Sequence, residues 1–318
     1  MNKKALTPRL LRHALATALL VPCIVLAAPF AYVSNEKSGT VSVIDTATDT
    51  VVAEMKAGAK PRGAAAARNV LYVSDQPANA LLMLDLKTRK AAGAVPLGES
   101  PEGVSASAAG DWIAAASEVT NAVSFIDTTS NRKEFSVPTQ GKNPEHAVFS
   151  PDGKLVMVSA EEADSVDLID VAARKQVASI KVGLRPRGIA FRPDGKLAYV
   201  ACEIASLVYV IDVPGRKVQK KIKAGSFSNG VTMAPDGSRV YISNGKDGTV
   251  SVIDTASNDV IATIPVGKRP WNMAITADGK KLYVANGRSN SVSVIDTASN
   301  AVSKEITVGE LPWGVVIQ

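Results

Sequence analysis

The chain has 318 residues, of which 46% are hydrophobic and 21% are charged, a composition typical of globular proteins with a large core. Its 36 Lys and Arg residues against 30 Asp and Glu residues give a formal net charge of +6, but residues 1–27 hold four of the basic residues and none of the acidic ones. Without that segment the charge is 32 − 30 = +2, which argues against nucleic acid as a partner. Cys23 lies inside the segment and Cys202 outside it, so we expect no disulfide within the mature chain.

Residues 1–27 have the pattern of a secretory signal peptide. The segment opens with four basic residues, Lys3, Lys4, Arg9 and Arg12. An apolar run follows at 14–26, and the small side chains of Val25 and Ala27 predict cleavage after Ala27. Because a membrane span needs roughly 20 apolar residues, this shorter run favours a cleaved leader over a membrane anchor. The sequence therefore predicts a periplasmic or secreted protein, with no membrane span after processing.

The mature chain opens on a predicted strand, Ala31-Tyr-Val-Ser-Asn35, and continues as a regular repeat. An aliphatic residue followed by Asp closes an apolar strand seven times, at intervals of 40, 42, 43, 42, 42 and 42 residues: Ile44-Asp45, Leu84-Asp85, Ile126-Asp127, Ile169-Asp170, Ile211-Asp212, Ile253-Asp254 and Ile295-Asp296. A second landmark follows each Asp by 16 or 17 residues: Pro61, Pro101, Pro144, Pro186, Ser228, Pro270 and Pro312. A unit of about 42 residues repeated seven times indicates a seven-bladed β-propeller.

Each unit contains four predicted strands. In the unit that begins at Pro270 they cover 272–276, 281–285, 291–295 and 302–308, with turn residues between them. The chain begins on a second strand and ends on an entry strand, 313–318, so we expect the C-terminal strand to become the innermost strand of the blade that holds residues 30–60. An open solenoid would need capped ends, and a β-sandwich would not keep this period. The sequence thus predicts an all-β fold, a single seven-bladed β-propeller domain over 28–318 with a composite closing blade.

Three segments resemble the YVTN propeller repeat, each followed by a strand of Val-Ser-Val-Ile-Asp type: Ala31-Tyr-Val-Ser-Asn35, Leu71-Tyr-Val-Ser-Asp75 and Leu282-Tyr-Val-Ala-Asn286. Further segments resemble one periplasmic group of that family, the propeller proteins associated with catabolism dependent on pyrroloquinoline quinone (PQQ): Ser100-Pro-Glu-Gly-Val104, Ser117-Glu-Val-Thr-Asn121 and Leu311-Pro-Trp-Gly-Val315. The resemblance implies a role beside quinoprotein alcohol oxidation and a quinoprotein dehydrogenase system as partner. It assigns no chemistry to any residue, and because the Trp-bearing repeats of PQQ-binding dehydrogenases are absent, we expect no bound cofactor.

The residues after the landmark prolines are the first candidate site, because blade geometry places them around the mouth of the central channel. They are Arg62, Glu102, Glu145, Arg187, Asn229, Trp271 and Trp313. At the next position glycine is usual, but His146 and Asn272 replace it. Trp is enriched at binding hot spots, so Trp271 and Trp313 are predicted to be exposed and to contact a protein or a small ligand. The alternative is a solvated rim of charges, with the two tryptophans packed under their own loops.

Two functional classes remain open at this stage. The sequence favours a binding or assembly protein over an enzyme, because it contains no Gly-x-Ser-x-Gly, phosphate-binding or zinc-protease motif. The alternative is a metal-dependent propeller enzyme of lyase or lactonase type, acting through His146, which is the only histidine left after processing. Zinc sites usually draw on several His or Cys ligands, so no metal site is assigned.

Overall fold

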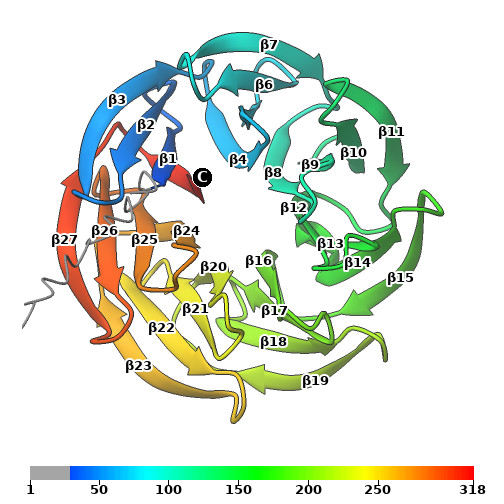
Figure 1. Cartoon of the computed structure of the whole chain (residues 1–318). Coiled ribbons are helices and arrows are strands. Elements are labelled where there is room, and N and C mark those ends of the chain that lie inside the picture. The colour runs from blue at the N-terminus through cyan, green and yellow to red at the C-terminus, as the bar shows by residue number, and fades with distance from the viewer. Residues whose placement is uncertain (1–28) are drawn as a thin grey trace, which may run out of the picture.

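The computed structural model describes residues 29–318, and the predicted signal peptide lies outside the described residues. Within 29–318, 28 strands form seven antiparallel four-stranded sheets, arranged as blades around a central axis (Figure 1). The only helical element in this part is a short 3-10 turn, η1 (Glu161–Ala163). None of the described residues form a helix long and apolar enough to cross a membrane. The predicted all-β, seven-bladed propeller is confirmed.

The blades are named A to G in chain order, and the strands of each run from the central axis outward. The inner and second strands are β28 (Pro312–Ile317) and β1 (Phe30–Asn35), β4 (Pro61–Ala67) and β5 (Val70–Asp75), β8 (Pro101–Ala106) and β9 (Trp112–Ser117), β12 (Pro144–Phe149) and β13 (Leu155–Ala160), β16 (Pro186–Phe191) and β17 (Leu197–Cys202), β20 (Ser228–Met233) and β21 (Arg239–Asn244), and β24 (Pro270–Ile275) and β25 (Lys281–Asn286). The third and outer strands are β2 (Thr40–Asp45) and β3 (Thr50–Lys56), β6 (Ala80–Asp85) and β7 (Lys90–Pro96), β10 (Ala122–Asp127) and β11 (Arg132–Pro138), β14 (Ser165–Asp170) and β15 (Lys175–Lys181), β18 (Leu207–Asp212) and β19 (Lys217–Ile222), β22 (Thr249–Asp254) and β23 (Asp259–Pro265), and β26 (Ser291–Asp296) and β27 (Ala301–Thr307).

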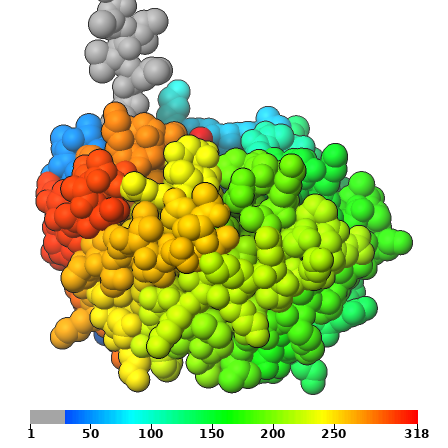
Figure 2. All heavy atoms as spheres, turned by 90° about the horizontal axis from the view of Figure 1, so that it is seen from below, coloured from blue at the N-terminus to red at the C-terminus, as the bar shows by residue number. Residues whose placement is uncertain are grey.

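The aliphatic and β-branched residues that mark the repeat fill the space between neighbouring blades. Second and third strands are buried along nearly their whole length, whereas outer strands are exposed to water at most positions. One such cluster joins blade G to blade A and contains Val33, Tyr283 and Val294. Seen from the side, blades E, F and G form a continuous wall (Figure 2). Burial of apolar surface between blades is therefore the main stabilising contribution to the ring.

The closing blade forms as the sequence predicts, because β28 is the inner strand of blade A and pairs with β1 (Figure 1). Val33 lies opposite Val315, and Phe30 and Gln318 exchange two backbone hydrogen bonds of 2.9 and 3.0 Å. Ring closure also removes two open sheet edges. In this strand Val315 is buried, whereas Val316 and Ile317 are half-buried.

A bulge at the start of each inner strand positions the candidate site. In blade B, Pro61 lies opposite Asp75 and Ala64 opposite Val73, so one extra residue is inserted on β4. The same irregularity occurs in the other six blades. A bulge redirects side chains, and here it places the residue after each landmark proline at the channel mouth. The following glycine is needed for close approach, because a Cβ at Gly63 would lie 2.2 Å from the Glu102 carbonyl oxygen in the next blade.

Candidate functional site

A pocket of about 370 Å³ lies at one mouth of the central channel. Its walls come from the residues after the landmark prolines, the residues before those prolines and the loops after the second strands. The lining residues are Lys60, Arg62, Gln76, Glu118, Asn143, Glu145, Glu161, Arg185, Arg187, Asn229, Arg269, Trp271 and Trp313. The volume falls within the range of small-molecule sites, and the wall is dominated by charged side chains.

The residue before each landmark shapes this pocket through an unusual backbone conformation. Asn143, Arg185 and Arg269 have φ values of 60°, 61° and 54°, in the left-handed region. In that conformation their carbonyls accept hydrogen bonds from the loop after the second strand; for example, the Glu161 amide donates to the Asn143 carbonyl at 3.0 Å. Two loops of each blade are thereby held together, and their side chains project over the same pocket.

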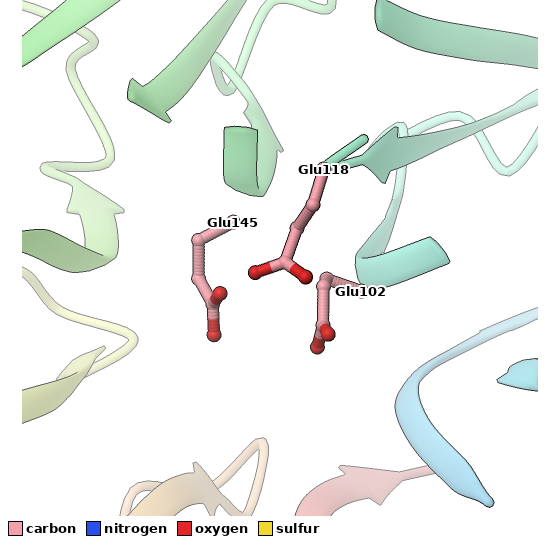
Figure 3. Close-up of side chains that lie close together, drawn as sticks. All are labelled: Glu102, Glu118 and Glu145. Carbon is pink, nitrogen blue, oxygen red and sulfur yellow. The ribbon is translucent and has the colours of Figure 1, made fainter. Parts of the chain in front are cut away.

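Three carboxylates meet on the side of the pocket formed by blades C and D. Glu102 on β8, Glu118 after β9 and Glu145 on β12 each offer one oxygen, and the three oxygens lie within 4.8 Å of one another (Figure 3). The side chain of Glu102 is fully buried and Glu145 is 2% exposed. Arg62 Nη1 donates to both oxygens of Glu102 at 2.6 Å, and Arg187 Nη1 lies 2.5 Å from Glu145 Oε1. The charges here are buried ion pairs, so the solvated-rim alternative is wrong for them.

Burial and mutual repulsion shift the pKa values of these carboxylates. Burial, followed by the charge of Glu145, raises the pKa of Glu102 to about 9. The same two causes raise the pKa of Glu118. Burial alone would also raise the pKa of Glu145, but Arg187 and Arg62 outweigh it and hold that pKa below its usual range. Burial and mutual repulsion therefore favour a shared proton in the cluster near neutral pH.

Three arginines meet on the opposite side of the pocket, formed by blades E to G. Glu203, which is 1% exposed, is their shared partner. Its carboxylate lies 2.5 Å from Arg269 Nη2, 3.1 Å from Arg187 Nε and 3.4 Å from Arg185 Nε. Glu161 also pairs with Arg185 and Arg187. Three guanidinium groups therefore meet the carboxylates of Glu161 and Glu203 on this side of the pocket.

Glu161 is the carboxylate whose titration lies closest to neutral pH. Burial raises its pKa to about 7, with the charge of Glu145 adding to the rise and those of Arg187 and Arg185 opposing it. An acid or base with a pKa near the working pH is best suited to proton transfer. Glu161 lies on η1 and lines the pocket. It is therefore the strongest candidate for acid–base chemistry among the lining residues.

Trp313 and His146 stack on each other, and Trp313 also lines the pocket. Their rings stack across the axis at a centroid distance of 5.6 Å and an interplanar angle of 12°, although they belong to blades A and D. Arg62 Cζ lies 5.9 Å from the Trp313 ring centroid. A second, smaller cavity of about 120 Å³ is lined by both rings and by Asn272. The Asn272 amide donates to the Trp313 carbonyl at 3.2 Å.

His146 is poorly placed for the role that the sequence suggested. Among residues 29–318 neither ring nitrogen has a hydrogen-bond partner, and both nitrogens are buried. Burial lowers the pKa of His146, so its imidazole is neutral at pH 7. His146 is also not part of the cluster of side chains that could hold a metal ion. A metal-dependent reaction acting through His146 is therefore not supported by this geometry.

The two tryptophans differ from the prediction that both are exposed. Trp313 is 7% exposed and buried in the stack. Trp271 is half-buried and packs on the bare backbone of its own blade, since a Cβ at Gly287 would lie 2.3 Å from its ring. The alternative left open by the sequence, a tryptophan packed against its own loop, therefore holds for Trp271. Both indoles nevertheless line the pocket.

Most of the predicted site residues do meet in the pocket. The structure brings six of them together in its wall: Arg62, Glu145, Arg187, Asn229, Trp271 and Trp313. Glu102 pairs with Arg62, and His146 and Asn272 line the smaller cavity. Arg185 and Arg269 were missed, although each directly precedes a landmark proline, which is a signal the sequence contains.

Fold and pocket define a seven-bladed β-propeller with a small, strongly polar site at its axis. Residues 138–308 match the family model described as "Lactonase, 7-bladed beta-propeller". The match covers 171 residues, more than half of the chain, so the protein belongs to this lactonase family. A search of curated proteins finds no match.

Solved structures with the same fold have low sequence identity. A chain of hydrazine synthase from Kuenenia stuttgartiensis is 23% identical, with a TM-score of 0.77, and the match covers 90% of this chain and 99% of that one. A putative 6-phosphogluconolactonase from Bacteroides fragilis is 18% identical, with a TM-score of 0.77 and coverages of 94% and 100%. Another from Bacteroides uniformis is 18% identical, with a TM-score of 0.76 and coverages of 91% and 99%. At these identities the likeness shows the fold alone. The YVTN and PQQ assignments stay predictions.

Proposed function

We propose that the protein hydrolyses a small polar lactone in the axial pocket. The observation that carries this is Glu161, a buried carboxylate with a pKa of about 7, placed beside Arg185 and Arg187 in the pocket of a lactonase-family propeller. We therefore favour an enzyme over the non-catalytic binding protein that the sequence favoured.

The reaction needs a base, a group that stabilises negative charge and a proton donor. Ionised Glu161 takes a proton from water as the water oxygen bonds to the acyl carbon of the lactone. The negative charge that develops on the carbonyl oxygen is stabilised by the guanidinium groups of Arg185 and Arg187. The ring C–O bond then breaks, and Glu161 returns the proton to the departing ring oxygen. The product is an open-chain hydroxy acid, which ionises at neutral pH.

The charge distribution of the pocket indicates the substrate class. The arginines of blades E to G favour a carboxylate or phosphate on the substrate, or its hydroxyl groups. The carboxylates of blades C and D accept hydrogen bonds from hydroxyl groups, and Trp271 offers an apolar ring face. We infer a hydroxylated or anionic lactone as the substrate, such as an aldonic acid lactone, and reject a long alkyl lactone.

The test is to incubate purified protein with a panel of lactones and to measure hydrolysis as the acid released at constant pH. δ-Gluconolactone, its 6-phosphate and γ-butyrolactone cover the hydroxylated, anionic and apolar classes. We expect hydrolysis of at least one of the first two, and a fall in kcat of about 10²–10⁴-fold in Glu161→Gln. Glu162→Gln is the matched control, because Glu162 is the exposed neighbour on the same turn. Equal activity in the wild type and Glu161→Gln would remove Glu161 from the mechanism.

We further propose that the enzyme works in the periplasm or outside the cell. The support is the leader-like pattern of residues 1–27, with a basic start and a short apolar run. N-terminal sequencing of the secreted form tests this, and the expected first residue is Ala28. A role beside PQQ-dependent alcohol oxidation, with a quinoprotein dehydrogenase system as partner, rests only on the family resemblance and is tested by co-purification with such a system.

A further inference from the structure

The three clustered carboxylates have more acceptor positions on their oxygens than the hydrogen bonds from the protein occupy. Glu145 Oε1 is bound by Arg187, but Glu145 Oε2 is buried and has no hydrogen-bond partner among the described residues. Glu118 Oε2 accepts a hydrogen bond from the Ser100 hydroxyl at 2.8 Å. Each carboxylate offers about four lone-pair positions, so all three retain acceptor capacity. A buried acceptor without a partner is costly, and it points to a ligand that the protein atoms do not supply.

The charges around the cluster lead to the same conclusion. Arg62 pairs with Glu102 and Arg187 pairs with Glu145, so two guanidinium groups face three carboxylates. One negative charge is left over when all three are ionised, and Arg187 is further shared with Glu161 and Glu203. Either a proton shared between two of the carboxylates or a bound cation can neutralise this surplus, but a cation can engage oxygens of all three at once.

We propose that Glu102, Glu118 and Glu145 bind one divalent cation of the oxygen-preferring class, Ca²⁺ or Mg²⁺. All three ligands are carboxylate oxygens, which suit hard cations, and His146 is not among them, which argues against zinc. Glu118 and Glu145 also line the pocket, so the cation faces the space where the lactone would bind. This goes beyond the sequence-based expectation of no metal site. It adds a cation to the pocket of the proposed function, but it does not depend on lactone hydrolysis.

Isothermal titration with CaCl₂ and with MgCl₂ tests the inference, on protein stripped by a chelator and without any lactone. We expect one binding site per chain, because the described residues contain one such cluster. Glu118→Gln should weaken binding at least about tenfold, and Glu145→Gln is a second isosteric variant in case the first does not fold. Glu162→Gln should bind like the wild type.

Absence of binding by both cations, or equal affinity in the wild type and in a folded Glu118→Gln or Glu145→Gln variant, would overturn the inference. The lactone assay is read separately. Cation binding without hydrolysis of any lactone leaves the cation site standing and removes the proposed function. Lactone hydrolysis in the presence of chelator, together with no cation binding, keeps the proposed function and removes the cation site.

Discussion

Removal of the C-terminal strand is the sharpest test of how the ring closes. A chain that ends at Leu311 lacks β28 and leaves blade A without its inner strand. The two large side chains lost from the core are Trp313 and Val315, which are 7% and 8% exposed. At roughly 1.5–3 kcal/mol for each large apolar side chain, their burial contributes roughly 3–6 kcal/mol. Folded domains are stable by only about 5–15 kcal/mol, so the truncated chain should be close to unfolding.

Thermal unfolding followed by circular dichroism measures this loss. For a large domain, about 2 °C of Tm corresponds to each kcal/mol, so Tm should fall by at least roughly 6–12 °C. A chain that lacks only Gln318 is the control, since it loses just the two backbone hydrogen bonds to Phe30. A synthetic peptide of residues 312–318 should partly restore Tm when added to the truncated chain. A truncated protein that melts within 2 °C of the full chain would refute the closure argument.

The remaining predictions concern the pocket. Trp313→Ala should cost about 3–5 kcal/mol in urea unfolding and Trp271→Ala clearly less, because only Trp313 is buried; equal losses would contradict the stack as a structural element. Arg187→Met should destabilise by about 3–5 kcal/mol, since it leaves Glu145 buried without its main partner, and a loss below 1 kcal/mol would speak against that pairing. The folded-state pKa of Glu102 is raised above its unfolded value, so the stability it contributes is present at low pH and is lost as pH rises through about 9. Tm should accordingly fall as pH rises from about 4.5 to about 9 and level off above that, and Glu102→Gln should flatten that dependence.

Much of the fold follows from short-range signals that recur along the chain. The Ile-Asp ends and landmark prolines locate every blade, and in the unit of Pro270 each strand lies within two residues of its predicted bounds. Closure of the ring by the C-terminal strand was predicted because the repeat is incomplete at both ends of the predicted domain. These features are readable because each depends on local strand and turn preferences and on a fixed period.

The site was less readable because its properties depend on distant contacts. Trp313 was predicted to be exposed, but it is covered by His146, 167 positions earlier in the chain and on another blade. The burial of Glu145 depends on the bulge that turns it into the channel and on Arg187 from the next blade. The pKa of Glu161 depends on three charges from other strands and loops. A repeat pattern places such residues around an axis, but it does not show which of them cover one another.

The most direct test of the account is the pH dependence of kcat for the best lactone substrate. If Glu161 is the base, kcat rises as pH increases through about 7, where Glu161 loses its proton, and then levels off. Glu161→Gln should remove this inflection along with most of the rate, whereas Glu162→Gln should keep both. A profile without an inflection near pH 7, or one that Glu161→Gln leaves in place, would contradict the assignment of the axial pocket as a lactonase site built on Glu161.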